Sequence, residues 1–92
     1  MAVYVDALIN YGWRLGPSCH MTADTIEELH LAASKVGMKR SWFQDKGDGF
    51  PHYDLVGRRR IAAVKNGAIE VTGWKNMSDH IKRIKSIYKP TI

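Results

Sequence analysis

The sequence of 92 residues contains one cysteine, Cys19. A single thiol excludes an internal disulfide framework and a zinc site made only of cysteines, so we expect a reducing, cytoplasmic location. No apolar run approaches the roughly 18 residues that a membrane-spanning helix needs. Residues 1–6 contain neither a basic segment nor a long apolar stretch, so we expect no secretory signal. These absences exclude a disulfide-rich secreted domain and a membrane-spanning helix.

Hydrophobic residues make up 45% of the chain and charged residues 25%, which is typical of a globular domain. The length predicts one basic α/β domain over residues 1–92. The net charge of +5 is unevenly spread. Residues 1–55 carry five basic and seven acidic side chains, whereas residues 56–92 carry nine basic and two acidic ones. The positive second half favours a phosphate-containing partner, although a simple solubilising surface is the alternative.

The first half of the chain predicts two strands and a helix. Residues 2–8 and 18–23 are rich in β-forming residues, and the segment 10–17 between them has the composition of a loop. Asp24 and Glu27 have the spacing of a capping box for a helix over residues 24–36. Gly37 stands where a glycine often ends a helix.

The second half predicts shorter elements. A brief strand fits residues 39–44, a turn fits 45–49, and 52–56 form either a strand or the lead into a helix. A helix fits 58–66 with Ile61 and Val64 facing inward, and a strand fits 68–71. A last helix is capped by Asn76 or Ser78 and ends at Pro90. The order predicts a small single-domain α/β sheet of three to four short strands with about three helices, a Rossmann-like fragment.

An ordered set of short motifs resembles a small domain family of unknown function from bacteria and their phages. The motifs are Tyr4-Val5-Asp6, Cys19-His20-Met21, Ala23-Asp24, Glu27-Glu28-Leu29-His30, Trp42-Phe43-Gln44, His52-Tyr53-Asp54-Leu55, Arg60 and Gly67-Ala68. Ala7 stands where the family pattern often has a second aspartate. The resemblance implies the fold, a rim of polar residues and a phage-encoded protein, but no particular reaction.

His52 and Asp54 form the densest group of reactive residue types, and His20 is a third candidate for catalysis. A histidine oriented by an aspartate suits general acid–base chemistry on a phosphoester. The alternative is that Asp54 caps the following helix. The histidine spacing matches no common metal motif, so we expect no cofactor, with a divalent metal as the less favoured alternative. Cys19 and His20 point to opposite faces of a strand and form no catalytic pair.

Basic residues gather on the two later predicted helices. The phosphate-binding candidates are Arg58, Arg59, Arg60, Lys82, Arg83 and Lys85. A solvated basic face is the alternative. The tryptophans Trp13, Trp42 and Trp74 are either packing anchors or platforms for stacking bases.

Asp6 and Asp24 end the first two strands and are candidate rim acids. If these strands are parallel, Asp6, Asp24 and His52 border one cleft that Arg60 overlooks. The connection of residues 10–17 is short for a parallel crossover and favours an antiparallel pair, which would place the two acids at opposite ends of the sheet.

The sequence favours a phosphate-recognising accessory domain that binds a nucleotide or nucleic acid through a basic rim, in the cytoplasm of a phage-infected host. One alternative is a small phosphoesterase or nuclease using His52 and Asp54. The other is a protein-interaction module that masks a host factor, with Trp13, Trp74 and the loop 10–17 as its exposed surface. No membrane partner is expected, and the oligomeric state is left open.

Overall fold

The computed structural model describes residues 2–88, which form one four-stranded sheet. The strands are β1 (Val3–Val5), β2 (Ser18–Ala23), β3 (Tyr53–Val56) and β4 (Ile69–Glu70), in the spatial order β3-β2-β1-β4. β2 runs antiparallel to both β1 and β3, and β4 runs parallel to β1. The antiparallel pairing of the first two strands follows the expectation from their short connection.

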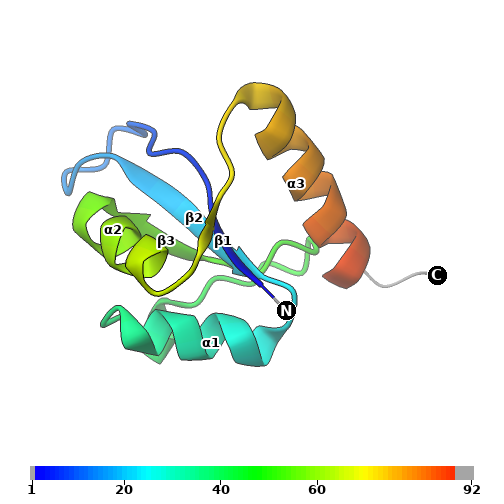
Figure 1. Ribbon diagram of the computed structural model, residues 1–92, viewed down its shortest axis with the longest axis horizontal. Coiled ribbons are helices and arrows are strands. Elements are labelled where there is room, and N and C mark those ends of the chain that lie inside the picture. The colour runs from blue at the N-terminus through cyan, green and yellow to red at the C-terminus, as the bar shows by residue number, and fades with distance from the viewer. Residues whose placement is uncertain (1, 89–92) are drawn as a thin grey trace.

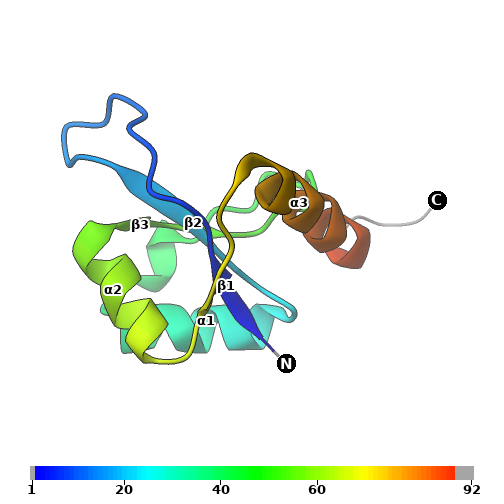
Figure 2. The same ribbon diagram turned by 45° about the horizontal axis from the view of Figure 1, so that its top comes forward.

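Three α-helices cover the sheet. They are α1 (Ile26–Lys35), α2 (Gly57–Lys65) and α3 (Trp74–Tyr88). α1 and α2 lie on one face of the sheet and α3 lies on the other (Figures 1 and 2). The small α/β class predicted from the sequence is therefore confirmed. Within residues 2–88, no helix is long and apolar enough to cross a membrane.

The hydrophobic core fills the layer between the sheet and the two helices α1 and α2. Alternate residues of a strand point to the same face, and Met21 and Leu55 are fully buried on this inner face. Leu29 and Ala33 of α1 and Ala63 of α2 complete the core. The strand residues that alternate with this inner set, most of them polar, point to the outer face.

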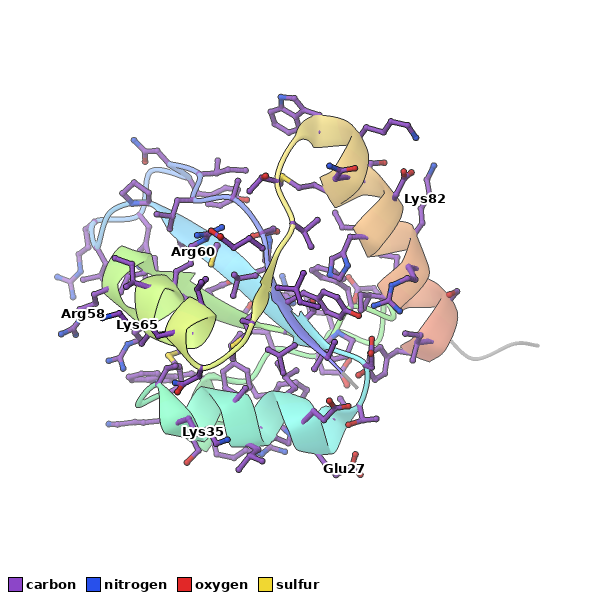
Figure 3. The ribbon with its side chains drawn as sticks, in the orientation of Figure 1. Glu27, Lys35, Arg58, Arg60, Lys65 and Lys82 are labelled. Carbon is purple, nitrogen blue, oxygen red and sulfur yellow. The ribbon has the colours of Figure 1, made fainter. Side chains whose placement is uncertain are left out.

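α1 begins two residues later than the sequence predicted and ends one residue earlier. Thr25, not Asp24, caps it: the Thr25 Oγ1 accepts the Glu28 N–H at 3.2 Å and donates to Glu28 Oε1 at 2.9 Å. Asp24 is instead bound to α3. Figure 3 shows Glu27 and Lys35 at opposite ends of α1, where their charges interact favourably with the helix dipole and so stabilise the helix. Gly37 follows the helix with φ +81°, as a helix-ending glycine requires.

Several predicted details in the second half are wrong. The segment 39–44, expected to be a strand, contains a 3-10 helix over Arg40–Trp42. The Lys39 side chain lies over the ring of Trp42, and the Arg40 side chain lies over the ring of Phe43. Such i→i+3 turns form where the chain bends too tightly for a strand.

One of the two predicted inward residues of α2 and the start of α3 also need correction. Ile61 is 60% exposed, whereas Ala63 lies in the core and Val64 packs against it as predicted. α3 begins at Trp74, ahead of Asn76 and Ser78, and Asn76 donates to the Thr72 carbonyl. The predicted end at Pro90 lies outside the described residues.

α3 is held to the outer face at the Ala23 end of β2. His80 Nε2 lies 2.8 Å from Thr22 Oγ1, and the Tyr88 hydroxyl donates to the Ala23 carbonyl at 2.6 Å. Arg83 forms an ion pair with Asp24 at 2.8 Å. These contacts leave the other end of the same face partly open to solvent.

Acidification is expected to destabilise the fold through His80. Burial, and then the charge of Arg83, lowers the pKa of His80 below 6.5, while Asp6 and Asp24 oppose this. The unfolded chain therefore binds more protons, so this contribution is complete above pH 6.5 and is lost as the pH falls through the lower folded pKa. Urea unfolding at about pH 7.5 and about pH 5 should show a larger loss of stability in the native protein than in His80→Gln. Equal losses in the two proteins would contradict this role.

Candidate active site at the open end of the outer face

One row of side chains crosses three strands on the outer face. His20 of β2 is the Cα partner of Asp54 in β3. Asp6 directly follows β1, and its backbone N–H donates to the His20 carbonyl at 3.2 Å. His52 precedes β3 and is bridged to Gln44 by two backbone hydrogen bonds. The antiparallel register therefore brings four residues, distant in sequence, to one place.

Both histidines of this row are held in one tautomer. His20 Nδ1 lies 2.8 Å from Asp6 Oδ2, and Asp6 Oδ1 also accepts the His20 backbone N–H. His52 Nδ1 donates to the Phe50 carbonyl at 2.8 Å. Since a carboxylate and a carbonyl only accept hydrogen bonds, each Nδ1 carries a proton. When a ring is neutral, its free lone pair is therefore on Nε2.

The two Nε2 atoms converge on one carboxylate oxygen. Asp54 Oδ1 lies 3.5 Å from His52 Nε2 and 4.0 Å from His20 Nε2, and one ligand atom from each residue lies within 4.8 Å of the other two. Gln44 Nε2 donates to Asp54 Oδ2 and fixes the carboxylate. Three hydrogen-bond acceptors thus face one another, and such an arrangement needs a proton or a metal cation between them.

The charge of Asp6 favours a proton on His20. The hydrogen bond to Asp6 raises the pKa of His20 above its ordinary value, although burial opposes the shift. The Asp6 side chain is 7% exposed, whereas 27% of His20 and 34% of Asp54 remain exposed. The site is therefore backed by a buried carboxylate and is open on its solvent side.

Aromatic rings border the two histidines. The Phe50 ring lies 5.6 Å from His20 and 5.2 Å from His52, centroid to centroid, and the Tyr11 ring lies 6.1 Å from His20. Burial and the negative charges of Asp6 and Asp54 raise the pKa of Tyr11.

Tyr11, Gln44 and Phe50 were missed as site residues. For Gln44, the Trp42-Phe43-Gln44 motif was the available signal. Tyr11 and Phe50 lie in loops whose position depends on the whole sheet, so no local pattern marks them.

The predicted cleft holding both Asp6 and Asp24 is wrong. In an antiparallel pair the end of one strand lies beside the start of the other, and Asp24 N–H accordingly donates to the Ala2 carbonyl. Asp24 binds Tyr4 and Arg83 at the far end of the sheet. Asp6 alone of the two rim acids lies at the site with His52.

The arginine run divides among three positions. Arg60 Nε donates to the Asp6 carbonyl at 2.8 Å and Arg60 also pairs with Glu70. Arg59 donates to the Val36 carbonyl at 2.8 Å. Among residues 2–88, the Arg58 side chain makes no hydrogen bond or ion pair and is exposed. Arg58 is thus the member of the run most available to a ligand.

The basic residues of α3 lie away from this run. Arg83 is paired with Asp24, and Lys82 and Lys85 belong to the same helix. Figure 3 places Lys82 on the side of the molecule opposite Arg58. The described structure therefore gathers the basic candidates at two separate places.

Cys19 and His30, two residues of the family motifs, have structural roles, and Asp54 does not cap a helix. Cys19 lies in the core, where burial raises the pKa of its thiol to about 12. His30 Nδ1 lies 2.8 Å from the Tyr53 hydroxyl, on the inner side of the sheet. Asp54 lies within β3 and caps no helix, since the residue at the start of α2 is Val56.

A cavity of about 670 Å³ adjoins the row of site residues. Asp54 and Gln44 form part of its wall. Trp13 and Trp42 supply two indole rings, and Arg58 lies at its edge. The candidate active site therefore opens onto a largely apolar space beside β3.

Comparison with known proteins identifies the family of this chain. Searches of curated proteins and of solved structures found no match. A family model described as "Protein of unknown function (DUF4031)" matches residues 3–84, nearly the whole chain. The chain therefore belongs to the DUF4031 family of proteins of unknown function.

Proposed function

We propose that the protein is a metal-dependent phosphoester hydrolase whose metal ligands are His20, His52 and Asp54. The observation that supports this proposal is the convergence of His20 Nε2 and His52 Nε2 on Asp54 Oδ1, at 4.0 and 3.5 Å. Zinc ligands about 2.1 Å from the metal in a tetrahedron lie roughly 3.4 Å from one another. Small side-chain rotations would bring these atoms to that spacing. The metal alternative that the sequence disfavoured is thus the one this geometry supports.

The donor set indicates the class of metal. Two imidazoles and a carboxylate suit zinc and other divalent transition metals. Three protein ligands leave a coordination position for water, as in hydrolytic zinc sites. A bound divalent ion lowers the pKa of its water and makes a nucleophile available at neutral pH. Hydrolysis fits this ligand set, because the reaction needs only water and no redox partner.

The surrounding residues position this set. Asp6 accepts the Nδ1 proton of His20 and so keeps Nε2 free to bind the metal. The Phe50 carbonyl does the same for His52, and Gln44 holds the Asp54 carboxylate. These contacts fix the ligand atoms before any ion arrives, which reduces the ordering cost of metal binding.

The other functions expected from the sequence are weaker proposals. A nucleotide-binding domain without catalysis is supported by the cavity and the exposed Arg58. A protein-interaction module is supported by the exposed side chains of Trp13 and Leu15. The cytoplasm of a phage-infected bacterium stays the proposed location, on the family resemblance and the single cysteine.

Zinc binding and phosphoester hydrolysis test the main proposal. In calorimetric titrations, we expect the native protein to bind one zinc ion per chain. His20→Gln and Asp54→Asn should each weaken zinc binding by at least ~100-fold, since even supporting residues around a metal contribute about 10- to 100-fold. His30→Gln is the matched control, because His30 lies outside the cluster, and it should bind zinc as the native protein does.

Hydrolysis of bis(p-nitrophenyl) phosphate should require the added metal and should stop with a chelator. The absence of both zinc and manganese binding would overturn the metal site. Hydrolysis that persists unchanged with the chelator would instead assign the histidines to acid–base chemistry without a metal.

A further inference from the structure

We infer that the cavity beside β3 binds the base of a nucleotide and so presents the phosphoester of that nucleotide to His20, His52 and Asp54. This inference rests on the proposed hydrolase function and names its substrate class. It depends on three features of the cavity: its continuity with the site, its aromatic walls and the position of its positive charge.

The cavity and the proposed metal site share a wall. Asp54 faces the two histidines through Oδ1, and both Asp54 and Gln44 line the cavity. A ligand that fills the cavity therefore contacts Asp54, the member of the cluster that lies between the cavity and the two histidines. The volume of about 670 Å³ lies within the range of small-ligand sites, about 300–1,000 Å³. A mononucleotide or the end of a single strand is of suitable size.

The walls suit a flat aromatic group. Trp13 comes from the loop after β1 and Trp42 from the 3-10 helix, and both line the cavity. Both rings remain partly exposed, at 44% and 43%. The Arg59 guanidinium lies 5.8 Å from the Trp42 ring centre and is itself tied to the Val36 carbonyl. The Lys39 ammonium also lies over the Trp42 ring, 5.5 Å from its centre, so two cations hold this ring in place while it stays partly exposed toward the cavity.

Positive charge lies at the same edge. Arg58 and Arg59 occupy the first turn of α2 and line the cavity. Val56, which precedes the helix, provides no side-chain acceptor for the first backbone N–H groups. These groups give the cavity a positive edge near Asp54, and a guanidinium suits phosphate oxygens. An apolar aromatic space with a cationic edge matches a base attached to a phosphate ester.

The reaction of such a ligand is a simple hydrolysis. Water attacks phosphorus and the bond from phosphorus to the ester oxygen breaks. The proton of water ends on the departing oxygen, which leaves as an alcohol. No oxidant or reductant enters the balance.

Binding to the metal-free protein separates this inference from the proposed function. The probes are adenosine monophosphate, ribose 5-phosphate as the matched ligand without a base, and a short single-stranded oligonucleotide, all measured with chelator at constant salt. We expect the nucleotide or the oligonucleotide to bind at least ~5-fold more tightly than ribose 5-phosphate, because one base–aromatic stack contributes roughly 5- to 150-fold in affinity. Whichever of these two ligands binds more tightly shows whether the base belongs to a free nucleotide or to a nucleic-acid strand.

The variants Trp13→Leu and Trp42→Leu should each remove most of that preference. Trp74→Leu is the matched control, because Trp74 is 82% exposed at the start of α3, and it should retain the preference. Equal binding of ribose 5-phosphate and both base-containing ligands, or a preference unchanged in both cavity variants, would overturn the inference. Zinc binding measured on the same variants reports separately on the proposed hydrolase, so a protein that binds zinc but shows no base preference contradicts the inference alone.

Discussion

The variant His52→Ala is expected to lose phosphoester hydrolysis by at least ~100-fold while keeping its fold. The reason is that His52 Nε2 lies 3.5 Å from Asp54 Oδ1 and is one of three proposed ligand atoms. Removal of one ligand leaves two, and a direct ligand should matter at least as much as a supporting residue, whose loss costs about 10- to 100-fold. The measurement is kcat/KM for bis(p-nitrophenyl) phosphate at saturating zinc, with circular dichroism to follow the fold.

His80→Gln is the control for this experiment. His80 lies on the same face of the sheet but binds Thr22 and lies outside the proposed metal cluster. Its substitution should leave kcat/KM close to that of the native protein. If His52→Ala destabilises the chain, His52→Gln preserves more of the side-chain volume and provides the same comparison. Full activity in a folded His52 variant would remove His52 from the catalytic set.

The variant Leu29→Ala is expected to lose about 2–5 kcal/mol of folding stability. Leu29 is fully buried between α1 and the inner face of the sheet. Its truncation removes the transfer energy of the lost methyl groups and leaves a cavity. Against a total stability of about 5–15 kcal/mol for a domain, this is a large fraction. Urea unfolding followed by circular dichroism measures the change.

Leu31→Ala is the matched control, since the same helix carries both leucines. Leu31 is 59% exposed, and substitutions at such positions usually change stability by no more than about 0.5 kcal/mol. If both variants lost the same stability, α1 would not be packed on the sheet as the structure has it.

The elements defined by local signals were predictable from the sequence. β2 was predicted with its observed bounds, because the loop residues Gly16 and Pro17 end just before it and Asp24 follows it. α1 was found from its apolar spacing, with bounds within two residues of those observed and with Asp24 instead of Thr25 as the capping residue. The segment 39–44 was assigned wrongly because its aromatic residues favour a strand, while their contacts with Lys39 and Arg40 support a turn.

The candidate site was predictable as a set of residue types but not as an arrangement. His20, His52 and Asp54 were singled out as reactive, yet their convergence depends on the register of β2 against β3. Residues 24–52 separate these strands, and no local pattern in that segment fixes which residue of β3 faces His20. The role of Asp6 as the partner of His20 depends likewise on the pairing of β1 with β2.

The register of β2 and β3 also decides whether the proposed metal site can form. His20 faces Asp54, and Cys19 faces Leu55 on the other side of the sheet. A slip of β3 by a single residue would turn every one of its side chains to the opposite face. Asp54 and His52, which share one face of this segment, would then both turn toward the apolar layer, and Leu55 or Tyr53 would take the place of Asp54 beside His20. A chain misfolded in this way would be unstable and would lack two of the three proposed metal ligands.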